Sequence, residues 1–392
     1  MERDLSAGMS NRDRMPGSLP APAGTYTCFR AAAVLLLLAA AAEAPRAQTA
    51  SCAATATSMT PAAWAPPAGH SPPGRPAGAA GLGASPLTLV ADVPLPGAAR
   101  RFDYQSVDTA AGRLYVSHMR GDRLVVYDLR RDRLVASLEG FPGATGVWAV
   151  PELHRVFVAV SGHHEVVAVD DSTLRVVARV PDVRFPDGIA HVPELGKVYV
   201  SDESGEADVV IDARRGVRVA TIPLGGEAGN THYDAVSRCI VVAVQTRNEL
   251  AAIDPASDRV VARYRVGCDH PHGFLIDEPN RMAFVSCEGD AKLLAIDLRT
   301  MRTTGTYRVG DDPDVLALDP GLHRLYVACE SGVVSVFDER GQTLTAAGEY
   351  RASHAHSVAV DPATHRVFLP LQDVGGRPVL RIMAPGPGAA AR

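Results

Sequence analysis

The chain has 392 residues and a formal net charge of −5, a length that allows one large domain or two ordinary ones. This mildly acidic balance argues against a nucleic-acid-binding protein, which would present a strongly basic face. Aromatic residues are few, at 5%, while Gly and Pro are frequent, at 35 and 29 residues. Together with many Val residues, this composition favours short strands separated by turns.

The N-terminal region, residues 1–50, has the layout of a secretory signal. Arg30 precedes an apolar segment from Ala31 to Ala42, and small residues follow in "AEA". A transmembrane helix needs about 20 apolar residues, so this segment is too short to span a membrane. We therefore expect a periplasmic or secreted protein without a transmembrane segment in the mature chain. Cys52, in "TASC", is a weak candidate for lipidation.

Two further segments have a composition that argues against a packed core. Residues 51–85 are dominated by Pro, Ala and Gly, as in "AAWAPPAGHSPPGRPAGAAGLGAS". Such a segment has little apolar surface to bury, and we expect a disordered linker. Residues 386–392, close to the end of the chain, are expected to form a flexible tail.

Residues 86–385 contain a sequence repeat. A basic residue precedes an apolar run seven times, and successive copies lie 41 to 43 residues apart. These markers are Arg113, Arg155, Lys197, Arg238, Arg281, Arg324 and Arg366. Each unit holds four short apolar runs separated by turn residues, which is the pattern of a β-propeller blade.

The seventh unit lacks one strand. The segment "LTLVADVPLP", from Leu87 to Pro96, precedes the first unit and is similar to the outer runs of the other units. Pairing this segment with the last unit would close the ring and leave no open blade edge. The sequence therefore predicts an all-β, seven-bladed propeller of four-stranded blades that is closed by its N-terminal strand.

The blades resemble a known bacterial repeat. The motif "RLYVS…G…LVVYDL…LVASL", which begins at Arg113, is similar to the YVTN repeat of the YncE-like propellers, a WD40-like architecture. The resemblance covers roughly three quarters of the chain and implies the fold. It does not imply one activity, because such propellers carry unrelated functions.

One position of the repeat carries acidic or histidine side chains in most units. It lies five residues before the Asp, or its equivalent, that ends the innermost strand. The residues found there are Asp103, Asp187, His272, Asp314 and His356, with His232 two or three residues further along its strand. The ends of the second strands add His118, Asp202, Cys287 and Cys329. We expect these side chains to face the central channel and to bind a ligand.

The same set contains the candidate metal ligands. His272, His356 and an Asp from Asp187 or Asp314 would suit a divalent zinc, copper or iron ion. His272 and His356 lie two blades apart, so a small molecule held between them by hydrogen bonds is the alternative. No cofactor other than a divalent metal ion is indicated.

The cysteines leave several pairings open. An exported protein permits disulfides, and Cys287 could pair with Cys329 on the neighbouring blade or with Cys268 on the same face. Free thiols facing the channel are the third alternative. No CxxCH motif is present, so covalent haem attachment is not indicated.

Three functions are compatible with these patterns. The favoured one is a monomeric, non-enzymatic binding protein for a small molecule, a metal ion or a cell-envelope protein. The second is a metal-dependent lactonase or esterase, although propellers of that type usually have six blades and no catalytic residue is identified by a motif. The third is a structural protein with a water-filled channel.

Overall fold

The computed structural model describes Cys52 and residues 85–386. The predicted signal region, nearly all of the predicted linker and residues 387–392 of the predicted tail lie outside these residues. Within them, strands run from Leu87 to Pro385. No helix in this part of the chain is long and apolar enough to cross a membrane.

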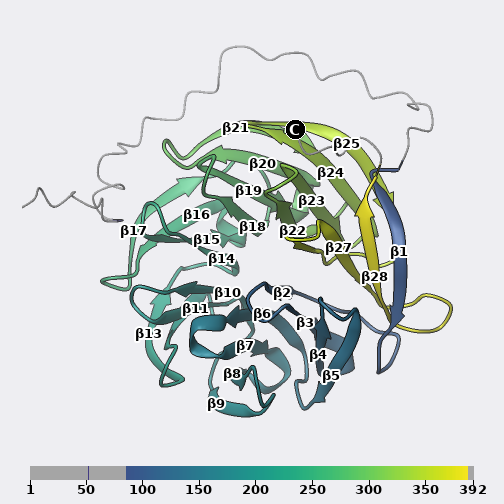
Figure 1. The fold of residues 1–392 in the computed structure, drawn as a ribbon. Coiled ribbons are helices and arrows are strands. Elements are labelled where there is room, and N and C mark those ends of the chain that lie inside the picture. Colours follow the sequence, from purple (N-terminus) through teal and green to yellow (C-terminus); the bar gives the residue numbers. More distant parts are fainter. Residues whose placement is uncertain (1–51, 53–84, 387–392) are drawn as a thin grey trace, which may run out of the picture. The chain divides into compact units, whose positions relative to one another are not determined.

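Seven antiparallel sheets of four strands each surround a common centre, as the sequence predicts (Figure 1). Blade 1 contains β2 (Gln105–Asp108), β3 (Arg113–His118), β4 (Arg123–Asp128) and β5 (Arg133–Glu139). Blade 2 contains β6 (Ala144–Val150), β7 (Arg155–Val160), β8 (Glu165–Asp170) and β9 (Val176–Val180). Blade 3 contains β10 (Pro186–Val192), β11 (Lys197–Asp202), β12 (Ala207–Asp212) and β13 (Val217–Pro223). Blade 4 contains β14 (Ala228–Asp234), β15 (Cys239–Val244), β16 (Glu249–Asp254) and β17 (Arg259–Arg265).

The remaining blades follow the same order. Blade 5 contains β18 (Pro271–Asp277), β19 (Met282–Cys287), β20 (Lys292–Asp297) and β21 (Arg302–Arg308). Blade 6 contains β22 (Pro313–Asp319), β23 (Arg324–Cys329), β24 (Val333–Arg340) and β25 (Thr343–Arg351). Blade 7 contains β26 (Ala359–Asp361), β27 (Arg366–Leu371), β28 (Val379–Pro385) and β1 (Leu87–Pro94). Single 3-10 turns lie at η1 (Met119–Gly121), η2 (Pro151–Leu153), η3 (Ser161–His163), η4 (Gln245–Arg247) and η5 (Glu288–Asp290).

The N-terminal strand closes the ring. β1 runs antiparallel to β28, with Leu87 opposite Pro385 and Pro94 opposite Val379. Figure 1 shows β1 at the outer edge of blade 7, beside the C-terminal strand. The prediction of closure by the N-terminal segment is therefore confirmed, and it gives the seventh blade the same four strands as the others.

The core consists of apolar clusters, several of which extend across neighbouring blades. Phe284 of blade 5, for example, belongs to one buried cluster with Leu325 and Val327 of blade 6. An aromatic residue recurs at this position of the second strand in most units, where it is fully or almost fully buried. The motif "YVS" and its variants thus supply the large side chains that hold adjacent blades together.

The innermost strands of blades 2 to 6 share an irregularity that positions the site. In blade 3, Pro186 lies opposite Asp202 and Ile189 lies opposite Val200. Two residues of β10, Asp187 and Gly188, therefore face a single residue of β11, which is a β-bulge. Equivalent shifts occur at the starts of β6, β14, β18 and β22. A bulge redirects side chains, so each of these strands can aim a residue differently from the regular pleat.

Glycines allow the innermost strands to approach one another at these bulges. A Cβ atom on Gly146 would lie 1.8 Å from the backbone oxygen of Asp187 on the next blade. A Cβ atom on Gly273 would lie 1.7 Å from the backbone oxygen of Asp314. No side chain fits at such distances, and glycine is therefore required where one backbone passes close to another.

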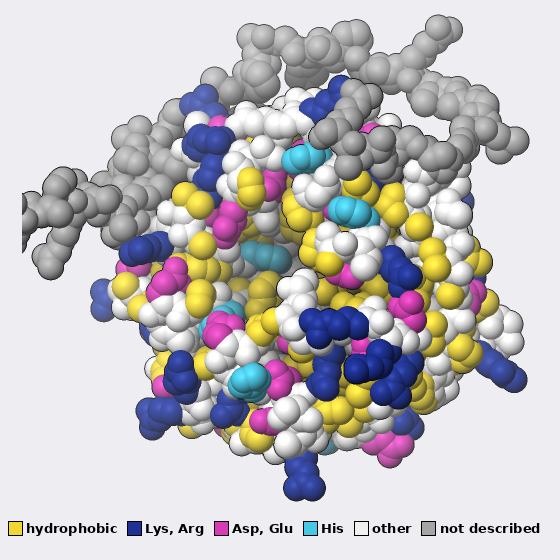
Figure 2. Space-filling view, viewed as in Figure 1, with side chains coloured by type: hydrophobic (Ala, Val, Ile, Leu, Met, Phe, Trp, Pro, Cys, Tyr) yellow, Lys and Arg dark blue, Asp and Glu magenta, His cyan; other side chains and the backbone are white. Residues whose placement is uncertain are grey.

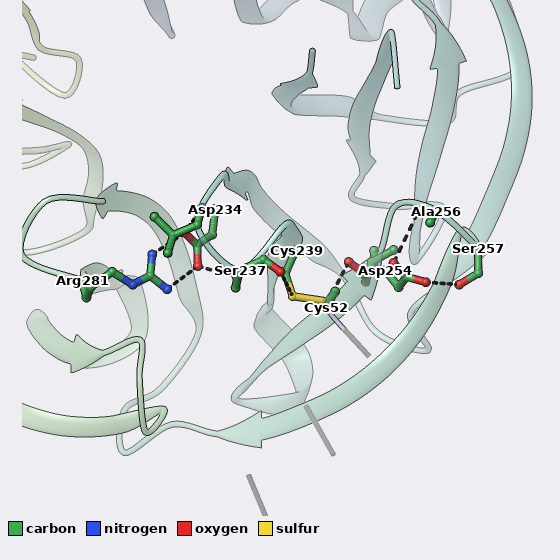
Figure 3. Close-up of a disulfide and its surroundings, with 10 residues drawn as sticks. Cys52, Asp234, Ser237, Cys239, Asp254, Ala256, Ser257 and Arg281 are labelled. Atoms are coloured by element: carbon green, nitrogen blue, oxygen red, sulfur yellow. Dashed lines mark hydrogen bonds and ion pairs between the residues drawn. A yellow bond between two sulfur atoms is a disulfide. The ribbon is translucent and has the colours of Figure 1, made fainter. Parts of the chain in front are cut away.

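Two disulfides lie among the described residues. Cys268 pairs with Cys287, with Cα atoms 6.1 Å apart, which is one of the two pairings that the sequence left open. Cys329, the other partner considered for Cys287, is a buried free thiol. Cys52 pairs with Cys239 at the start of β15, with Cα atoms 5.0 Å apart (Figure 3). A sulfur atom in this disulfide cannot also carry a lipid, so lipidation and the Cys52–Cys239 bond are mutually exclusive.

The bulge geometry predicts a strong position dependence of glycine substitutions. Gly273→Ala should lower the free energy of unfolding by about 2 kcal/mol or more, because its Cβ would overlap the Asp314 backbone. Gly267→Ala is the matched control, since nothing lies within 4 Å of the added atom. Denaturant unfolding of both variants measures the difference, and equal stabilities would contradict the close packing at the bulge.

Candidate functional site

Five of the eight predicted ligand-binding residues converge at one end of the channel. Asp187, His272 and Asp314 occupy the bulges of β10, β18 and β22, while Asp103 and His356 lie just before β2 and β26. All five residues are buried. They come from blades 1, 3, 5, 6 and 7, so the ring places side chains together that are far apart in the sequence.

Asp314 is central to this group. Its Oδ1 atom lies 3.4 Å from Nε2 of His272. Its Oδ2 atom lies 4.0 Å from Nε2 of His356 and 3.9 Å from Nη2 of Arg101. His356 Nε2 is also 4.0 Å from Oδ1 of Asp103. The two histidines therefore do not contact each other across the channel, and the carboxylate from the blade between them serves both.

Tyr104 extends from blade 1 to the opposite side of the channel. Its hydroxyl donates to Oδ1 of Asp314 at 3.2 Å and lies 3.2 Å from Nε2 of His272. Nδ2 of Asn230 donates to the same hydroxyl at 2.5 Å. Tyr104 thus links blades 1, 4, 5 and 6 within a single hydrogen-bonded group, which limits how far these strands can move apart.

Three glutamates and one arginine surround the buried residues. Arg101 pairs with Glu330 at 2.5 Å, and Glu288 lies 3.9 Å from Nδ1 of His272. Glu203 accepts a hydrogen bond from Gln245 at 3.4 Å, and the charge of His272 also acts on it. Arg101 is the one arginine or lysine among the described residues that forms an ion pair with this group.

Burial and mutual repulsion raise the pKa of two aspartates. Burial raises the pKa of Asp103 well above its usual range, and the charges of Asp187 and Asp314 add to this effect. Burial raises the pKa of Asp187 to about 7, although the charge of His272 opposes the change. Such carboxyl groups hold a proton near neutral pH unless a cation is present to stabilise the charged form.

The pKa values of His272 and Asp314 are instead shifted so that both groups are charged. Burial alone would raise the pKa of Asp314, but the hydrogen bond and charge of His272 outweigh it and lower the pKa to about 2. Burial alone would lower the pKa of His272, but Glu288 and Asp314 raise it well above its usual value. His356 differs, because burial lowers its pKa despite the nearby Asp314. The site therefore holds one charged pair next to a neutral imidazole.

Several site atoms are buried without a hydrogen-bond partner among the described residues. They are Oδ2 of Asp187, Nδ1 of His272 and Nε2 of His356. Each has an oppositely charged or polar neighbour at 3.7 to 4.0 Å, slightly beyond hydrogen-bond distance. Two ligands bonded at about 2.0–2.2 Å to one tetrahedral ion lie roughly 3.3–3.6 Å apart. The observed separations of 3.7 to 4.0 Å are longer than this range, so these groups would have to approach one another slightly to share an ion.

Two sets of three side chains could hold a metal ion, and they share Asp314. The first set is Asp103, Asp314 and His356, and the second is His272, Glu288 and Asp314. In each set, one ligand atom from every residue lies within 4.8 Å of the others. Each set contains one imidazole and two carboxylates. From the sequence, we instead expected His272 and His356 in one site with Asp187 or Asp314. The structure places the two histidines in different sets, and Asp187 belongs to neither.

The predicted residues at the second-strand ends have other surroundings. His118 is buried and stacks on Phe102, with ring centroids 4.0 Å apart. Asp202 accepts hydrogen bonds from the backbone N–H groups of Arg184, Phe185 and Gly205 at 2.8 to 3.1 Å. These contacts are typical of a turn cap. Cys287 is held in its disulfide. Within the described part of the chain, the hydrogen bonds, ring contacts and ion pairs of His118, Asp202 and Cys287 do not involve the five clustered side chains.

His232 belongs to a different part of the channel. Its ring lies edge-on to Trp148 and Phe274, with centroids 6.3 and 5.4 Å away. Burial lowers its pKa to about 4, so the imidazole is neutral. In β14 it follows Asn230 by two residues, toward the other end of the strand.

Sequence reasoning did not identify Tyr104 or Arg101. A weak signal exists for Tyr104, because three blades have Gly at the position after the ring residue, whereas blade 1 has Tyr. Arg101 precedes the repeat position by two residues and has no equivalent signal.

Figure 2 shows one face of the propeller, which is hollowed near its centre. In the face that Figure 2 shows, acidic and histidine side chains lie around this hollow, and a group of Lys and Arg side chains lies to one side of it. Such a mixed distribution is consistent with the overall mild acidity of the chain.

Comparison with known proteins supports the fold. No protein-family model and no curated protein sequence matches this chain. A solved structure of hydrazine synthase from Kuenenia stuttgartiensis is similar, with a TM-score of 0.60 and 16% sequence identity. The match covers 73% of this chain and 96% of that one. At this identity the likeness concerns the propeller architecture alone.

The raised pKa of Asp187 predicts a pH-dependent stability effect. Its folded pKa of about 7 exceeds the usual value of 3.8, so the stability contribution falls as the pH rises between these values. In metal-free buffer, Asp187→Asn should therefore raise the free energy of unfolding at pH 8, on the order of 1 to 4 kcal/mol, and change it little at pH 4. Denaturant titrations at both pH values measure this difference.

Asp170→Asn is the control with the opposite sign. Hydrogen bonds from Thr173 and Ser172 hold the pKa of Asp170 well below its usual value. Its contribution is present above about pH 4 and is lost as the pH falls. This variant should be less stable than the parent at pH 8. An Asp187→Asn variant that is also destabilised at pH 8 would contradict the electrostatic account.

Proposed function

We propose that the clustered side chains bind a divalent transition-metal ion, and that the chain is an exported, monomeric, YncE-like binding protein. The observation that carries this proposal is the arrangement around Asp314. Two sets of potential ligands share its carboxylate, and three buried polar atoms beside it have no hydrogen-bond partner among the described residues. Buried polar atoms are rarely left unpaired unless a water or an ion completes the site.

The charge balance supports a cation. Six carboxylates surround the site, namely Asp103, Asp187, Asp314, Glu203, Glu288 and Glu330. Arg101 is the permanently charged cation paired with them among the described residues. The three aspartates are buried, and burying several acidic groups together is unfavourable unless they are protonated or neutralised. A divalent ion would provide two positive charges at the position where the carboxylates converge.

The ligand types favour particular metals. Ca²⁺ and Mg²⁺ prefer oxygen ligands alone, whereas each set here includes an imidazole. Zinc, iron and copper accept mixed imidazole and carboxylate ligands. We therefore expect a transition metal, with zinc as the first ion to test.

Three features support export and the family assignment. Disulfides form in oxidising compartments, and two are present among the described residues. The repeated "RLYVS"-type strands provide the resemblance to YVTN repeats. The signal-like segment before residue 50 is consistent with a periplasmic or secreted location.

Metal binding can be tested with the ligand that both sets share. Chelator-treated protein should bind about one equivalent of Zn²⁺ by isothermal titration calorimetry. Asp314→Asn should weaken this binding by about tenfold or more, because a ligand is lost from either set. His270→Ala is the matched control, since this exposed residue lies two positions from His272 and belongs to neither set.

The proposal fails if the chelator-treated chain takes up no divalent ion, or if Asp314→Asn and His270→Ala bind it equally well. The absence of metal uptake would favour the other occupants that the sequence leaves open, a small polar molecule or a cell-envelope protein. Elemental analysis of untagged protein purified from the native compartment provides an independent measurement.

One observation favours a metal-dependent hydrolase as the second candidate. Asp187 lies 3.7 Å from His272 and has a pKa of about 7, which suits a general base near neutral pH. A metal ion on the His272–Asp314 side would polarise a lactone or aryl ester carbonyl. A water molecule would attack that carbonyl, and Asp187 would take the water proton. The same proton would pass from Asp187 to the leaving oxygen as the C–O bond breaks.

The hydrolase candidate makes a separate prediction. The zinc-loaded protein should hydrolyse a lactone or an aryl ester such as 4-nitrophenyl acetate. Asp187→Asn should lower kcat by about 100-fold, because the general base is lost, while zinc content stays near that of the parent. Zinc bound without turnover would leave the binding function standing and eliminate the hydrolase.

A further inference from the structure

A separate cavity lies at the other end of the same inner strands. Its volume is about 350 Å³. Trp148, His191, His232, Tyr233, Ile276 and Glu278 are among the residues that line it. In β10, His191 follows Asp187 by four residues, a distance of roughly 13 Å along a strand. The cavity is therefore distinct from the site around Asp314, and its size is at the lower end of the range for small-molecule sites.

His191 lines this cavity and has a buried ring nitrogen without a hydrogen-bond partner among the described residues. Its side chain is only 8% exposed, and Nδ1 lies 3.2 Å from Oε1 of Glu152. Burial lowers the pKa of His191, so its ring is neutral and carries one proton. With that proton on Nδ1 toward Glu152, Nε2 has a free lone pair. Nε2 is buried and has no hydrogen-bond partner among the described residues. A ligand N–H or O–H donor would satisfy this nitrogen once the side chains that cover it move aside.

The charge around the cavity favours a cation. Glu278 lines it, and neither Lys nor Arg does. Glu194 accepts a hydrogen bond from the Tyr233 hydroxyl at 3.1 Å, which places a second carboxylate beside the wall. Arg238 is the basic group whose charge acts on Tyr233, and it does not line the cavity. An anionic ligand would therefore face repulsion, whereas a cation would be stabilised.

The walls provide apolar and aromatic surface. Trp148 and His232 lie edge-to-face, with ring centroids 6.3 Å apart. Trp148 and Tyr233 offer electron-rich ring faces, which attract cations that approach within about 6 Å. Ile276 adds aliphatic surface beside them. The cavity thus combines a carboxylate, an unpaired acceptor and aromatic walls.

We propose that this cavity binds a small organic ammonium ion that carries an N–H donor and an apolar body. The ammonium group would donate to Nε2 of His191 and pair with the carboxylate of Glu278. The apolar body would pack against Trp148 and Ile276. This inference is independent of the metal site, because none of these residues belongs to either set of metal ligands.

Three probes of similar shape and different charge test the proposal. They are 2-phenylethylammonium, the neutral 2-phenylethanol and the anionic 3-phenylpropionate. The sequence contains two tryptophans, Trp64 and Trp148, so a Trp64→Phe background makes Trp148 the one tryptophan reporter. The ammonium ion should change Trp148 fluorescence saturably at pH 7.5. The alcohol should bind about tenfold more weakly, and the carboxylate should not bind.

Variants then locate the charge that is recognised. Glu278→Gln should weaken ammonium binding by about tenfold and leave alcohol binding unchanged. It keeps an oxygen for the hydrogen bond that Glu278 accepts from the Ala235 N–H group. Glu139→Gln is the control, because that glutamate is 75% exposed on the outer strand β5. It should not change the affinity.

Three results would overturn the proposal. The first is no saturable binding of the ammonium ion up to millimolar concentration, and the second is equal affinity for the ammonium ion and the alcohol. The third is an unchanged ammonium affinity in Glu278→Gln that retains the parent melting temperature. Because the first two use the chain without a cavity substitution, the test does not depend on the folding of a cavity variant. Binding that persists after chelator treatment separates this site from the metal site.

Discussion

The β-bulge at the start of the inner strand is the constraint on which the rest of the site depends. In blades 2 to 6, two inner residues face one residue of the second strand. The extra residue turns Asp187, His272 and Asp314 out of the regular pleat and toward one another. Glycine at Gly146 and Gly273 lets the neighbouring backbones pass closely enough for this convergence. A propeller with regular inner strands would distribute these side chains differently.

Because the acidic side chains converge, their negative charges repel one another, and the protein offsets this repulsion for only some of them. Asp314 is stabilised by its hydrogen bond to His272 and by Arg101, and its pKa is low for that reason. Asp103 and Asp187 lack an equivalent partner, and their pKa values are raised. Regions that retain unpaired buried polar atoms are where function is most often found. The proposed metal ion would complete the interactions that His272 or His356 lacks within the described chain, depending on which of the two sets binds it.

The two ends of the channel differ in chemistry although the same strands form both. One end gathers carboxylates and imidazoles around Asp314, and the other combines aromatic walls with Glu278 and a neutral His191. The strands β10, β14 and β18 therefore carry one set of side chains near their start and a different set toward their end.

The sequence by itself determined the repeat, the number of blades, the closure by the N-terminal strand and the position that faces the channel. These features are periodic, and a period of 41 to 43 residues is visible without any knowledge of contacts. The alignment of repeats placed Asp103, Asp187, His272, Asp314 and His356 at equivalent positions, and the structure brings all five together.

Only the tertiary structure decided which atoms meet across the ring. It placed Asp314 between the two histidines, directed Tyr104 across the channel and assigned His118 and Asp202 to packing and turn contacts. It also paired Cys52 with Cys239, which are 187 residues apart. Contacts between blades depend on ring closure, side-chain length and the direction imposed by each bulge. A repeat pattern records none of these quantities, because it compares each blade with its copies and not with its neighbours in space.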